Sequence, residues 1–342
     1  MQIVVDAMGS DSHPVPEVRG AIEAVKAFGD PIILVGNEAL ISPQLEAFGG
    51  SKLIKIVHAP ETLEMTDKPA ENARRKSQNS MAIGMELIKS GDADVFFTAG
   101  NTGGAMANAL FRLGRIRGVK RPALTALFPV RNGYCVVTDI GANADCKPEY
   151  LLQFALMGSV YAEKVLGITK PRVGLLSNGE EPGKGNDLVK SAYPMLASSG
   201  LNFIGNVEGK ELFGGQADVV VTDGFTGNVL LKTSESVAKF ITDTMRQELT
   251  QSVATKVGAL LAKPAFVRLK QLLDPGEHGA APLLGIDALV FVGHGKSDER
   301  AIFNAIRVAR QAVQADLLAS IRNSIQEKLT APVVTNTPGA AE

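Results

Sequence analysis

The sequence predicts an α/β fold with a mostly parallel but mixed β-sheet. Short apolar runs alternate with segments of helical periodicity along most of the chain, which is typical of βαβ units. Two apolar runs, 123–130 and 135–139, flank Asn132-Gly133, the strongest short-range signal for an antiparallel hairpin. The length of 342 residues is long for one hydrophobic core and suits one large α/β domain or two lobes.

Continuous apolar runs predict the strands, and apolar residues three to four positions apart predict the helices. Strands are expected at residues 2–5, 32–35, 54–58, 93–97, 123–130, 135–139, 173–176, 203–206, 217–221 and 289–292. Helices are expected at residues 17–28, 68–89, 105–113, 149–166, 188–198, 229–249, 256–273 and 299–325, with Pro264 opening a new helix. We expect one domain over residues 1–328, a protruding helical hairpin at about 229–273, and a disordered tail at 329–342.

The composition excludes several classes of protein. Hydrophobic residues make up 45% and charged residues 21%, as in ordinary globular proteins, and the formal net charge of −1 gives no signal for nucleic acid. Two cysteines, Cys135 and Cys146, form no disulfide framework and suit a reducing compartment. We find no signal peptide and no apolar run of about 18 residues, and therefore expect a cytoplasmic protein.

A glycine-rich turn follows the apolar run at 93–97. Gly100-Asn101-Thr102-Gly103 leads directly into the helical pattern at 105–113. The free N–H groups of such a turn and the positive end of the helix bind anions, and the Thr102 hydroxyl is a candidate helix cap. The alternative is that these glycines only permit a tight connection between strand and helix.

Five further strand ends resemble this turn in composition. These five lie near Asp6, Asp139, Gly179, Asp223 and His294, and the turn at Gly100 is the sixth. In a parallel sheet, ligands bind beyond the carboxyl ends of the strands. We therefore expect the six loops to share one edge of the sheet and to line a large polar cleft.

Two groups of basic residues are candidate binding surfaces. The first turns of the helix at 68–89 carry side chains that suit phosphate, namely Asn72, Arg74, Arg75, Lys76, Ser77 and Ser80. For any one of these residues, a solvated helix face with local pairing to Glu71 is the favoured interpretation. The second group has no acid among its members and suits an acidic partner, or the carboxyl end of a helix: Arg112, Arg115, Arg117, Lys120 and Arg121.

The familiar site signatures are missing. The sequence has no Gly-x-Gly-x-x-Gly with a following acid, no Walker A loop, no zinc spacing and no Gly-x-Ser-x-Gly. We therefore expect neither a cofactor nor a metal. Cys146 is interpreted as an ordinary loop thiol rather than a nucleophile, whereas His294, inside a glycine loop, is a candidate acid, base or phosphate donor.

An ordered series of motifs runs over residues 2–325. It comprises Asp6-Ala7-Met8-Gly9 with Asp11, Ala99-Gly100-Asn101-Thr102-Gly103, Asp139-Ile140-Gly141-Ala142-Asn143, Gly179-Glu180-Glu181 with Lys184-Gly185, Gly205-Asn206-Val207-Glu208-Gly209, Asp223-Gly224-Phe225-Thr226-Gly227-Asn228, Pro282-Leu283-Leu284-Gly285 and His294-Gly295-Lys296-Ser297. The series closely resembles the fatty acyl-acyl-carrier-protein:phosphate acyltransferases, the PlsX family. Four departures occur: Ser10 replaces a usual second glycine, Gln78-Asn79 a usual Asp-Ser, Ser177-Asn178 a common Asn-Ile, and Ala280 one glycine of a pair.

The resemblance implies a three-layer α/β/α sandwich like that of phosphotransacetylases and isocitrate-dehydrogenase-like enzymes, assembled as a homodimer. It implies transfer of a long acyl group from acyl carrier protein to inorganic phosphate, which gives acyl phosphate for phosphatidic acid and phospholipid synthesis. Phosphate is itself the nucleophile, so the protein must supply positioning and oxyanion stabilisation. The alternatives are a phosphotransacetylase-like enzyme that uses coenzyme A and a non-catalytic, membrane-associated scaffold of lipid synthesis.

Roles follow for individual residues. We expect Lys184 and the Asn101 turn to bind phosphate, and Asn228 and His294 to orient the thioester or polarise its carbonyl. The remaining phosphate- or substrate-binding candidates are Asp6, Gly9, Asn72, Arg74, Lys76, Ser80, Gly100, Thr102, Gly103, Asp139, Asn143, Glu181, Asp223 and Ser297. The basic run from Arg112 to Arg121 is the candidate docking face for acyl carrier protein.

Residues 256–273 have an apolar face that contains Phe266, Leu269, Leu272 and Leu273, with basic residues beside it. A basic amphipathic tip suits a membrane interface, and a contact with a second subunit explains the same pattern. We accordingly expect peripheral association with the inner face of the membrane. A membrane-bound glycerol-3-phosphate acyltransferase is a candidate partner there.

Overall fold

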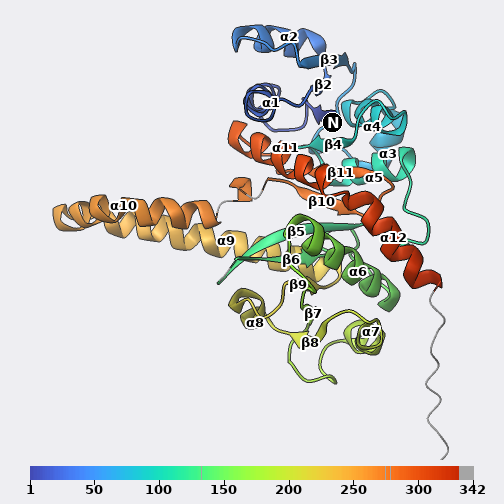
Figure 1. Cartoon of the computed structure of the whole chain (residues 1–342). Helices are drawn as coiled ribbons and strands as arrows, with labels where there is room; N and C mark the ends of the chain where they lie inside the picture. Colours follow the sequence, from blue (N-terminus) through green and yellow to red (C-terminus); the bar gives the residue numbers. More distant parts are fainter. Residues whose placement is uncertain (132, 274, 278, 331–342) are drawn as a thin grey trace, which may run out of the picture.

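The computed structural model describes residues 1–131, 133–273, 275–277 and 279–330. Its centre is an eleven-stranded sheet in the order β3-β2-β1-β4-β11-β10-β5-β6-β9-β7-β8 (Figure 1). The strands are β1 (Ile3–Asp6), β2 (Ile32–Gly36), β3 (Ile54–His58), β4 (Val95–Thr98), β5 (Ala123–Val130), β6 (Gly133–Thr138), β7 (Val173–Leu176), β8 (Phe203–Val207), β9 (Val219–Val221), β10 (Ala281–Leu284) and β11 (Leu289–Val292).

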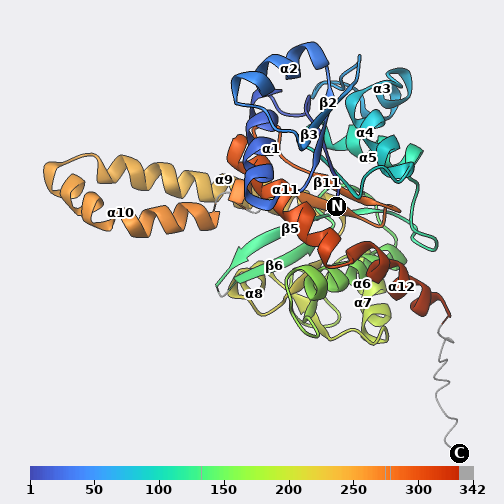
Figure 2. The same ribbon diagram turned by 45° about the horizontal axis from the view of Figure 1, so that its top comes forward.

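Helices cover both faces of this sheet, which confirms the three-layer α/β/α arrangement (Figure 2). One hydrophobic core lies under α1 (Val15–Phe28), α2 (Glu38–Ala47), α6 (Pro148–Val165), α7 (Asp187–Ala197), α11 (Glu299–Gln314) and α12 (Leu317–Thr330). The other lies under α3 (Pro69–Arg75), α4 (Ser80–Lys89), α5 (Thr102–Arg112), α8 (Gly209–Gly214) and the first turns of α9 (Gly224–Leu249). Most strands are buried on both faces, so they appear in the sequence as continuous apolar runs.

The parallel strands at the two sides of the sheet run in opposite directions, and β10 and β5, between them, alternate in direction. β3, β2, β1, β4 and β11 are mutually parallel, and β10 is antiparallel to both β11 and β5. The predicted hairpin is confirmed: β5 and β6 pair antiparallel from Thr125↔Thr138 to Val130↔Gly133, and β9, β7 and β8 continue parallel to β6. The carboxyl ends of β1, β4 and β11 therefore share one edge, while those of β6, β9 and β7 share the opposite edge. The prediction of six loops at a single edge is wrong.

Several expected element boundaries are also corrected. The helix expected at 68–89 is two helices, because the Asn79 side chain accepts a hydrogen bond from the Ala82 amide and starts α4 anew. The helix expected at 299–325 breaks before α12, where Asp316 takes a left-handed φ of 50°. The elements α2, α8 and β10 were not expected from the sequence. Asn132 and residues 331–342, most of the expected tail, lie outside the described residues.

Helices α9 and α10 (Val253–Leu273) form an arm that projects from the sandwich (Figure 1). The 26 residues of α9 correspond to about 39 Å of helix. Only Gly224 and Gly227, in its first turn, are fully buried. Pro264 lies inside α10 and does not open a new helix, and the 3₁₀ turn η1 (Pro275–Glu277) leads from the arm back towards β10. The protruding hairpin is thus present.

Candidate active site

Three loops at the first edge lie against one another because their strands β1, β4 and β11 are neighbours. The loop after β1 (residues 7–14) is packed tightly on the turn after β4: a Cβ added to Gly9 would lie 2.8 Å from the Gly100 nitrogen. The same loop is bonded to the turn after β11, since the Asp11 amide donates to the Gly295 carbonyl oxygen at 2.7 Å. The contact at Gly9 explains why no residue with a side chain fits there.

A buried hydrogen-bond chain fixes the turn after β4. The Thr98 hydroxyl donates to Asp6 Oδ2 at 2.6 Å and accepts from the Gly100 amide at 2.9 Å. Asp6 is fully buried, and its other oxygen accepts from the Met8 amide. Burial raises the pKa of Asp6, which hydrogen bonds from Thr98 and Ser80 partly offset. Asp6 and Ser80 therefore support the turn from below instead of contacting a substrate.

The turn ends in the amino terminus of α5, and the helix cap is Asn101 instead of the expected Thr102. Asn101 Oδ1 accepts from the Gly104 amide at 2.9 Å, while Nδ2 donates to the carbonyl oxygens of Glu64, Met65 and Asp67. Thr102 is exposed and Gly103 half-buried; among the described hydrogen bonds, neither of their amides has an acceptor. Two backbone N–H groups at a positive helix end are thus available to an anion.

The turn after β11 brings His294 to the same edge. The Lys296 amide donates to His294 Nδ1 at 3.1 Å, which assigns the ring proton to Nε2. The exposed ring therefore offers an Nε2–H donor. Ser297 is occupied within the turn, because its hydroxyl donates to the His294 carbonyl oxygen at 2.6 Å. The turn is anchored to β4 by a hydrogen bond from the Gly293 amide to the Thr98 carbonyl oxygen.

The polar residues of α3 hold their own segment together. Lys76 Nζ donates to Asp67 Oδ2 at 2.6 Å and to the Thr62 carbonyl oxygen at 2.8 Å, and Asn72 donates to Asp67 Oδ1. The Lys76 ammonium keeps the pKa of Asp67 below its usual range. Arg74 stacks over the Phe111 ring at 4.7 Å. The expected role as phosphate ligands is therefore not supported for Asn72 and Lys76, whose polar groups have protein partners, and it stays a prediction for the exposed Arg74.

At the opposite edge, Asp139 organises its own loop. Its Oδ1 accepts from the amides of Leu124, Gly141 and Ala142, and its Oδ2 accepts from the amide and side chain of Asn143. Asp223 caps α9 through the Thr226 amide and hydroxyl. Asp139 thus accepts five hydrogen bonds from the protein and Asp223 two, so a direct substrate contact is not supported for Asp139 or for Asn143, which is bonded to it, while the role of Asp223 stays a prediction.

Lys184 and Glu181 are exposed in the loop after β7, and Asn228 is exposed in the first turn of α9, all at this second edge. From β4 to β7 the sheet makes six inter-strand steps, roughly 29 Å. Within one chain, Lys184 and the Asn101 turn cannot bind the same phosphate. Asn228 and His294 likewise cannot act on the same thioester, because four steps and opposite edges separate them. These shared roles are wrong for a single chain.

Neither cysteine has the chemistry of a nucleophile. Burial raises the pKa of the Cys146 thiol to about 12, and it also raises the pKa of Cys135, which lies inside β6. Among the described residues, Glu180, Glu208 and Glu211 form the one group of three or more possible metal ligands, with one oxygen of each within 4.8 Å of the others. The Lys210 ammonium occupies this group, at 2.9 Å from Glu180 and 3.4 Å from the other two.

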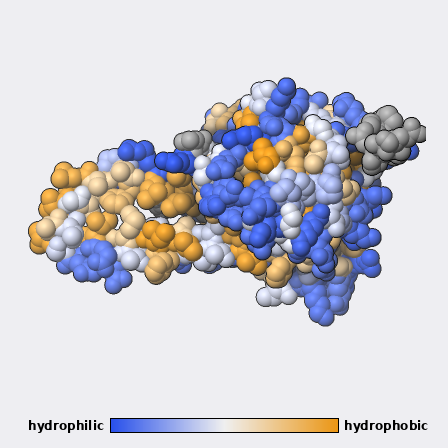
Figure 3. All heavy atoms as spheres, turned by 90° about the horizontal axis from the view of Figure 1, so that it is seen from below, coloured by the Kyte–Doolittle hydropathy of each residue, from blue (hydrophilic) through white to orange (hydrophobic). Residues whose placement is uncertain are grey.

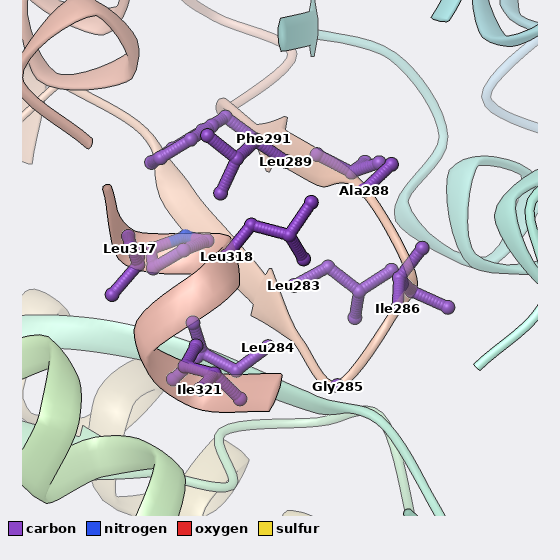
Figure 4. Close-up of a pocket in the computed structure, with 12 residues that line it drawn as sticks. Leu283, Leu284, Gly285, Ile286, Ala288, Leu289, Phe291, Leu317, Leu318 and Ile321 are labelled. Atoms are coloured by element: carbon purple, nitrogen blue, oxygen red, sulfur yellow. The ribbon is translucent and has the colours of Figure 1, made fainter. Parts of the chain in front are cut away.

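A small cavity between β10, β11 and α12 measures about 10 Å³ and is lined by aliphatic side chains such as Leu283, Leu318 and Ile321 (Figure 4). It has room for at most one water molecule, and no polar side chain of the described residues lines it. It therefore belongs to the core.

Some side chains of the basic run from Arg112 to Arg121 are hydrogen-bonded within the protein, and others are exposed without an acidic partner among the described residues. Arg112 donates to Glu86 at 2.9 Å and to the Ser77 carbonyl oxygen, and Arg115 donates to the Lys120 carbonyl oxygen. Arg117, Lys120 and Arg121 are exposed, and no acid of the described chain lies within ion-pair distance of them. Arg115 is exposed as well and forms no ion pair within the part of the chain that the structure describes, so it keeps its charge beside these three, whereas Arg112 is paired with Glu86.

Two supporting residues were not expected from the sequence. Thr98 ends β4, and Glu17 lies on the buried face of α1. Thr98 follows the strand expected at 93–97 and Glu17 begins the helix expected at 17–28, and neither was given a role. A hydroxyl at the end of a buried strand, one position before Ala-Gly, is a signal that could have identified Thr98. The spacing around Glu17 contains no comparable signal.

Comparison with known proteins places the chain in a family. Residues 1–320 match the family model described as "Fatty acid synthesis protein". A phosphate acyltransferase of Elusimicrobium minutum is 48% identical over 329 residues, covering 96% of each chain. One from Pelotomaculum thermopropionicum is 47% identical over 326 residues, covering 95% of each.

Among solved structures, a phosphotransacetylase from Streptococcus pyogenes superposes with a TM-score of 0.63 at 18% identity, covering 92% of this chain and 94% of that one. A branched-chain phosphotransacylase from Enterococcus faecalis gives a TM-score of 0.55 at 16% identity, covering 91% of this chain and 99% of that one. At these identities the likeness concerns the fold, which confirms the expected fold class. From the family model and the relatives, the chain belongs to the phosphate acyltransferase (PlsX) family and is an acyltransferase.

Proposed function

We propose that the chain transfers a fatty acyl group from acyl carrier protein to inorganic phosphate, and that phosphate binds at the amino terminus of α5. The observation that carries the proposal is the pair of available amides at Thr102 and Gly103, with the His294 Nε2–H on the neighbouring turn. A phosphate oxygen attacks the thioester carbonyl carbon, the carbon–sulfur bond breaks, and the carrier thiol leaves as thiolate. Acyl phosphate is the product, available to phospholipid synthesis.

The protein has two tasks in this reaction. Backbone N–H groups at a helix terminus hold phosphate and reduce the freedom that a bimolecular step would otherwise lose. The His294 Nε2–H stabilises negative charge on the carbonyl oxygen as the bond to phosphate forms. A leaving thiol with a pKa near 8.5 needs little help from a general acid. No covalent intermediate on the protein is required, in keeping with the raised pKa of both cysteine thiols.

The test is Thr102→Pro, with Thr102→Ala as its matched control. Proline fits the first position of a helix and removes one amide donor, while Asn101, at ψ 111°, already has the backbone that precedes proline. Loss of one charge-assisted hydrogen bond predicts a phosphate KM raised about tenfold or more in Thr102→Pro and little changed in Thr102→Ala. Equal phosphate KM values in the two variants would reject the site.

The acyl donor is tested separately. Steady-state assays with acyl-acyl carrier protein and with acyl-coenzyme A distinguish the proposed activity from a phosphotransacetylase-like one. Phosphate-dependent thiol release with either donor excludes the non-catalytic scaffold. We propose that Arg117, Lys120 and Arg121 contact the acidic carrier. Arg117→Glu with Arg121→Glu should then raise the carrier KM most at low salt, whereas Arg115→Glu, which loses the hydrogen bond to the Lys120 carbonyl oxygen, should also lower thermal stability.

The arm is the proposed site of association with a membrane, on its cytoplasmic side, or with a second copy of the chain. Its exposed apolar residues gather along both helices (Figure 3), and Leu261 is 80% and Val253 79% exposed. Of the expected contact residues, Leu269 and Leu272 are exposed and Phe266 and Leu273 are half-buried, and more exposed apolar residues lie nearer the tip. None of the described helices is long and apolar enough to span a bilayer.

The double variant Leu260→Asp, Leu261→Asp distinguishes a membrane from a second copy of the chain as the partner of the arm. Loss of liposome flotation with an unchanged sedimentation mass supports the membrane, and a halved mass supports the homodimer. Unchanged flotation and mass would exclude both. In the membrane case, a membrane-bound glycerol-3-phosphate acyltransferase is the proposed consumer of the product.

A further inference from the structure

The loop after β1 contacts both turns of the proposed phosphate site, and Ser10 is at its centre. Gly9, on one side of Ser10, contacts the turn that contains Gly100. Asp11, on the other side, donates its amide to Gly295 at 2.7 Å. The backbone around Ser10 is therefore linked to both the Gly100 turn and the His294 turn.

Two side chains hold the backbone of Ser10. Glu17 Oε1, from the first turn of α1, accepts from the Ser10 amide at 2.9 Å, and His13 Nδ1 lies 2.7 Å from the Ser10 carbonyl oxygen, to which it donates. The Ser10 amide is thus satisfied by the Glu17 side chain, and the Ser10 carbonyl oxygen by the His13 ring together with the His13 amide, which donates to it at 3.2 Å. Glu17 is fully buried and Ser10 is 2% exposed, so water does not compete for these bonds.

Glu17 does not act as a cap of its own helix. The residue before α1 is Pro14, and no side chain caps this terminus. Glu17 Oε2 and the Ser10 hydroxyl oxygen are both buried without a hydrogen-bond partner among the described residues. A carboxyl group in this position is costly to bury, and burial raises its pKa to about 7. An apolar residue would be the ordinary choice on this face of α1, which makes the contact with Ser10 the only evident benefit.

We propose that Glu17 is a positioning residue: through the Ser10 amide, it sets the spacing between the anion-binding turn at Gly100 and the His294 turn. The inference rests on the proposed phosphate site for its effect on catalysis. Its structural part, the fixing of residues 6–14, is measurable without any substrate.

The experiment compares Glu17→Met, which removes the acceptor, with Glu17→Gln, which keeps an acceptor oxygen of the same reach. Glu23→Ala, exposed on the same helix, is the matched control. Amide hydrogen exchange without substrate should accelerate at least tenfold over residues 6–14 and 98–104 in Glu17→Met, and stay within twofold of the wild type in the other two. The phosphate KM should rise at least fivefold in Glu17→Met, with a smaller change in the KM of the acyl donor.

The outcomes separate this inference from the proposed function. Unchanged exchange in a folded Glu17→Met protein, or accelerated exchange in Glu17→Gln, overturns the positioning role. If exchange accelerates in Glu17→Met and its phosphate KM equals that of the wild type, the link to the phosphate site is overturned. A wild-type chain without phosphate-dependent activity rejects the proposed function, and the exchange data still decide the role of Glu17. If Glu17→Met fails to fold, the wild-type Ser10 amide decides: exchange as fast as in an exposed loop rejects the bond.

Discussion

Burial of Glu17 predicts a pH dependence of stability that can be worked out from the structure. Its pKa is 4.5 in an unstructured chain and about 7 in the fold, because desolvation disfavours the carboxylate. Since the folded state holds this proton more tightly, the stabilisation is complete below pH 4.5 and is lost as pH rises through 7. At about 1.4 kcal/mol per pH unit, the difference between the two pKa values corresponds to about 3 kcal/mol in the free energy of unfolding. About 2.5 kcal/mol of this is lost between pH 5 and 8.

Urea denaturation at pH 5, 6, 7 and 8 measures this term, with Glu17→Gln as the comparison. Glutamine keeps the shape and cannot ionise, so its free energy of unfolding should fall about 2.5 kcal/mol less over this range than that of the wild type. Asp6, whose pKa burial also raises, is present in both proteins and cancels in the comparison. Parallel pH profiles for the two proteins would refute the reasoning, and a wild-type stability that increases from pH 5 to 8 would reverse its sign.

Three further predictions concern the site and its support. His294→Ala should lower kcat about 10²–10³-fold by removing an oxyanion donor, whereas His294→Gln, which keeps an N–H, should retain more of kcat; equal kcat values for the two would contradict the donor role. Lys76→Met should cost about 1–2 kcal/mol of stability in thermal unfolding without changing the phosphate KM, because its partners are Asp67 and Thr62. A Cβ on Gly227 would lie 1.9 Å from the Asp139 carbonyl oxygen, so Gly227→Ala should lower the melting temperature by many degrees, while Gly214→Ala, with open space around it, should not.

Local signals in the sequence were sufficient for the elements that local chemistry decides. Asn132-Gly133 predicted the β5–β6 hairpin, and the glycines after Phe97 predicted the turn that opens α5. The break between α3 and α4 was also within reach, since Asn79 is a preferred capping residue in the middle of the expected helix.

The placement of the loops depends on strand order, which local patterns do not contain. β10 is four residues long, includes Pro282 and was not expected as a strand, yet its insertion between β11 and β5 decides the direction of β6, β9 and β7. The roles of Lys76 and Asp139 were misjudged for a related reason. A charged side chain in a polar loop suggests a ligand, and only the fold reveals that carbonyls and amides from distant residues already satisfy it.

The arm also bears on how cooperatively the molecule unfolds. Free energies of local opening follow the apolar area that each segment buries, and beyond its first turn α9 has no fully buried residue. The arm should therefore open and exchange its amides at a lower free energy than the sheet, as a separate folding unit inserted between β9 and β10. A probe on the arm and a probe in the core would then report different midpoints, so a stability quoted for this protein must name the part to which it refers.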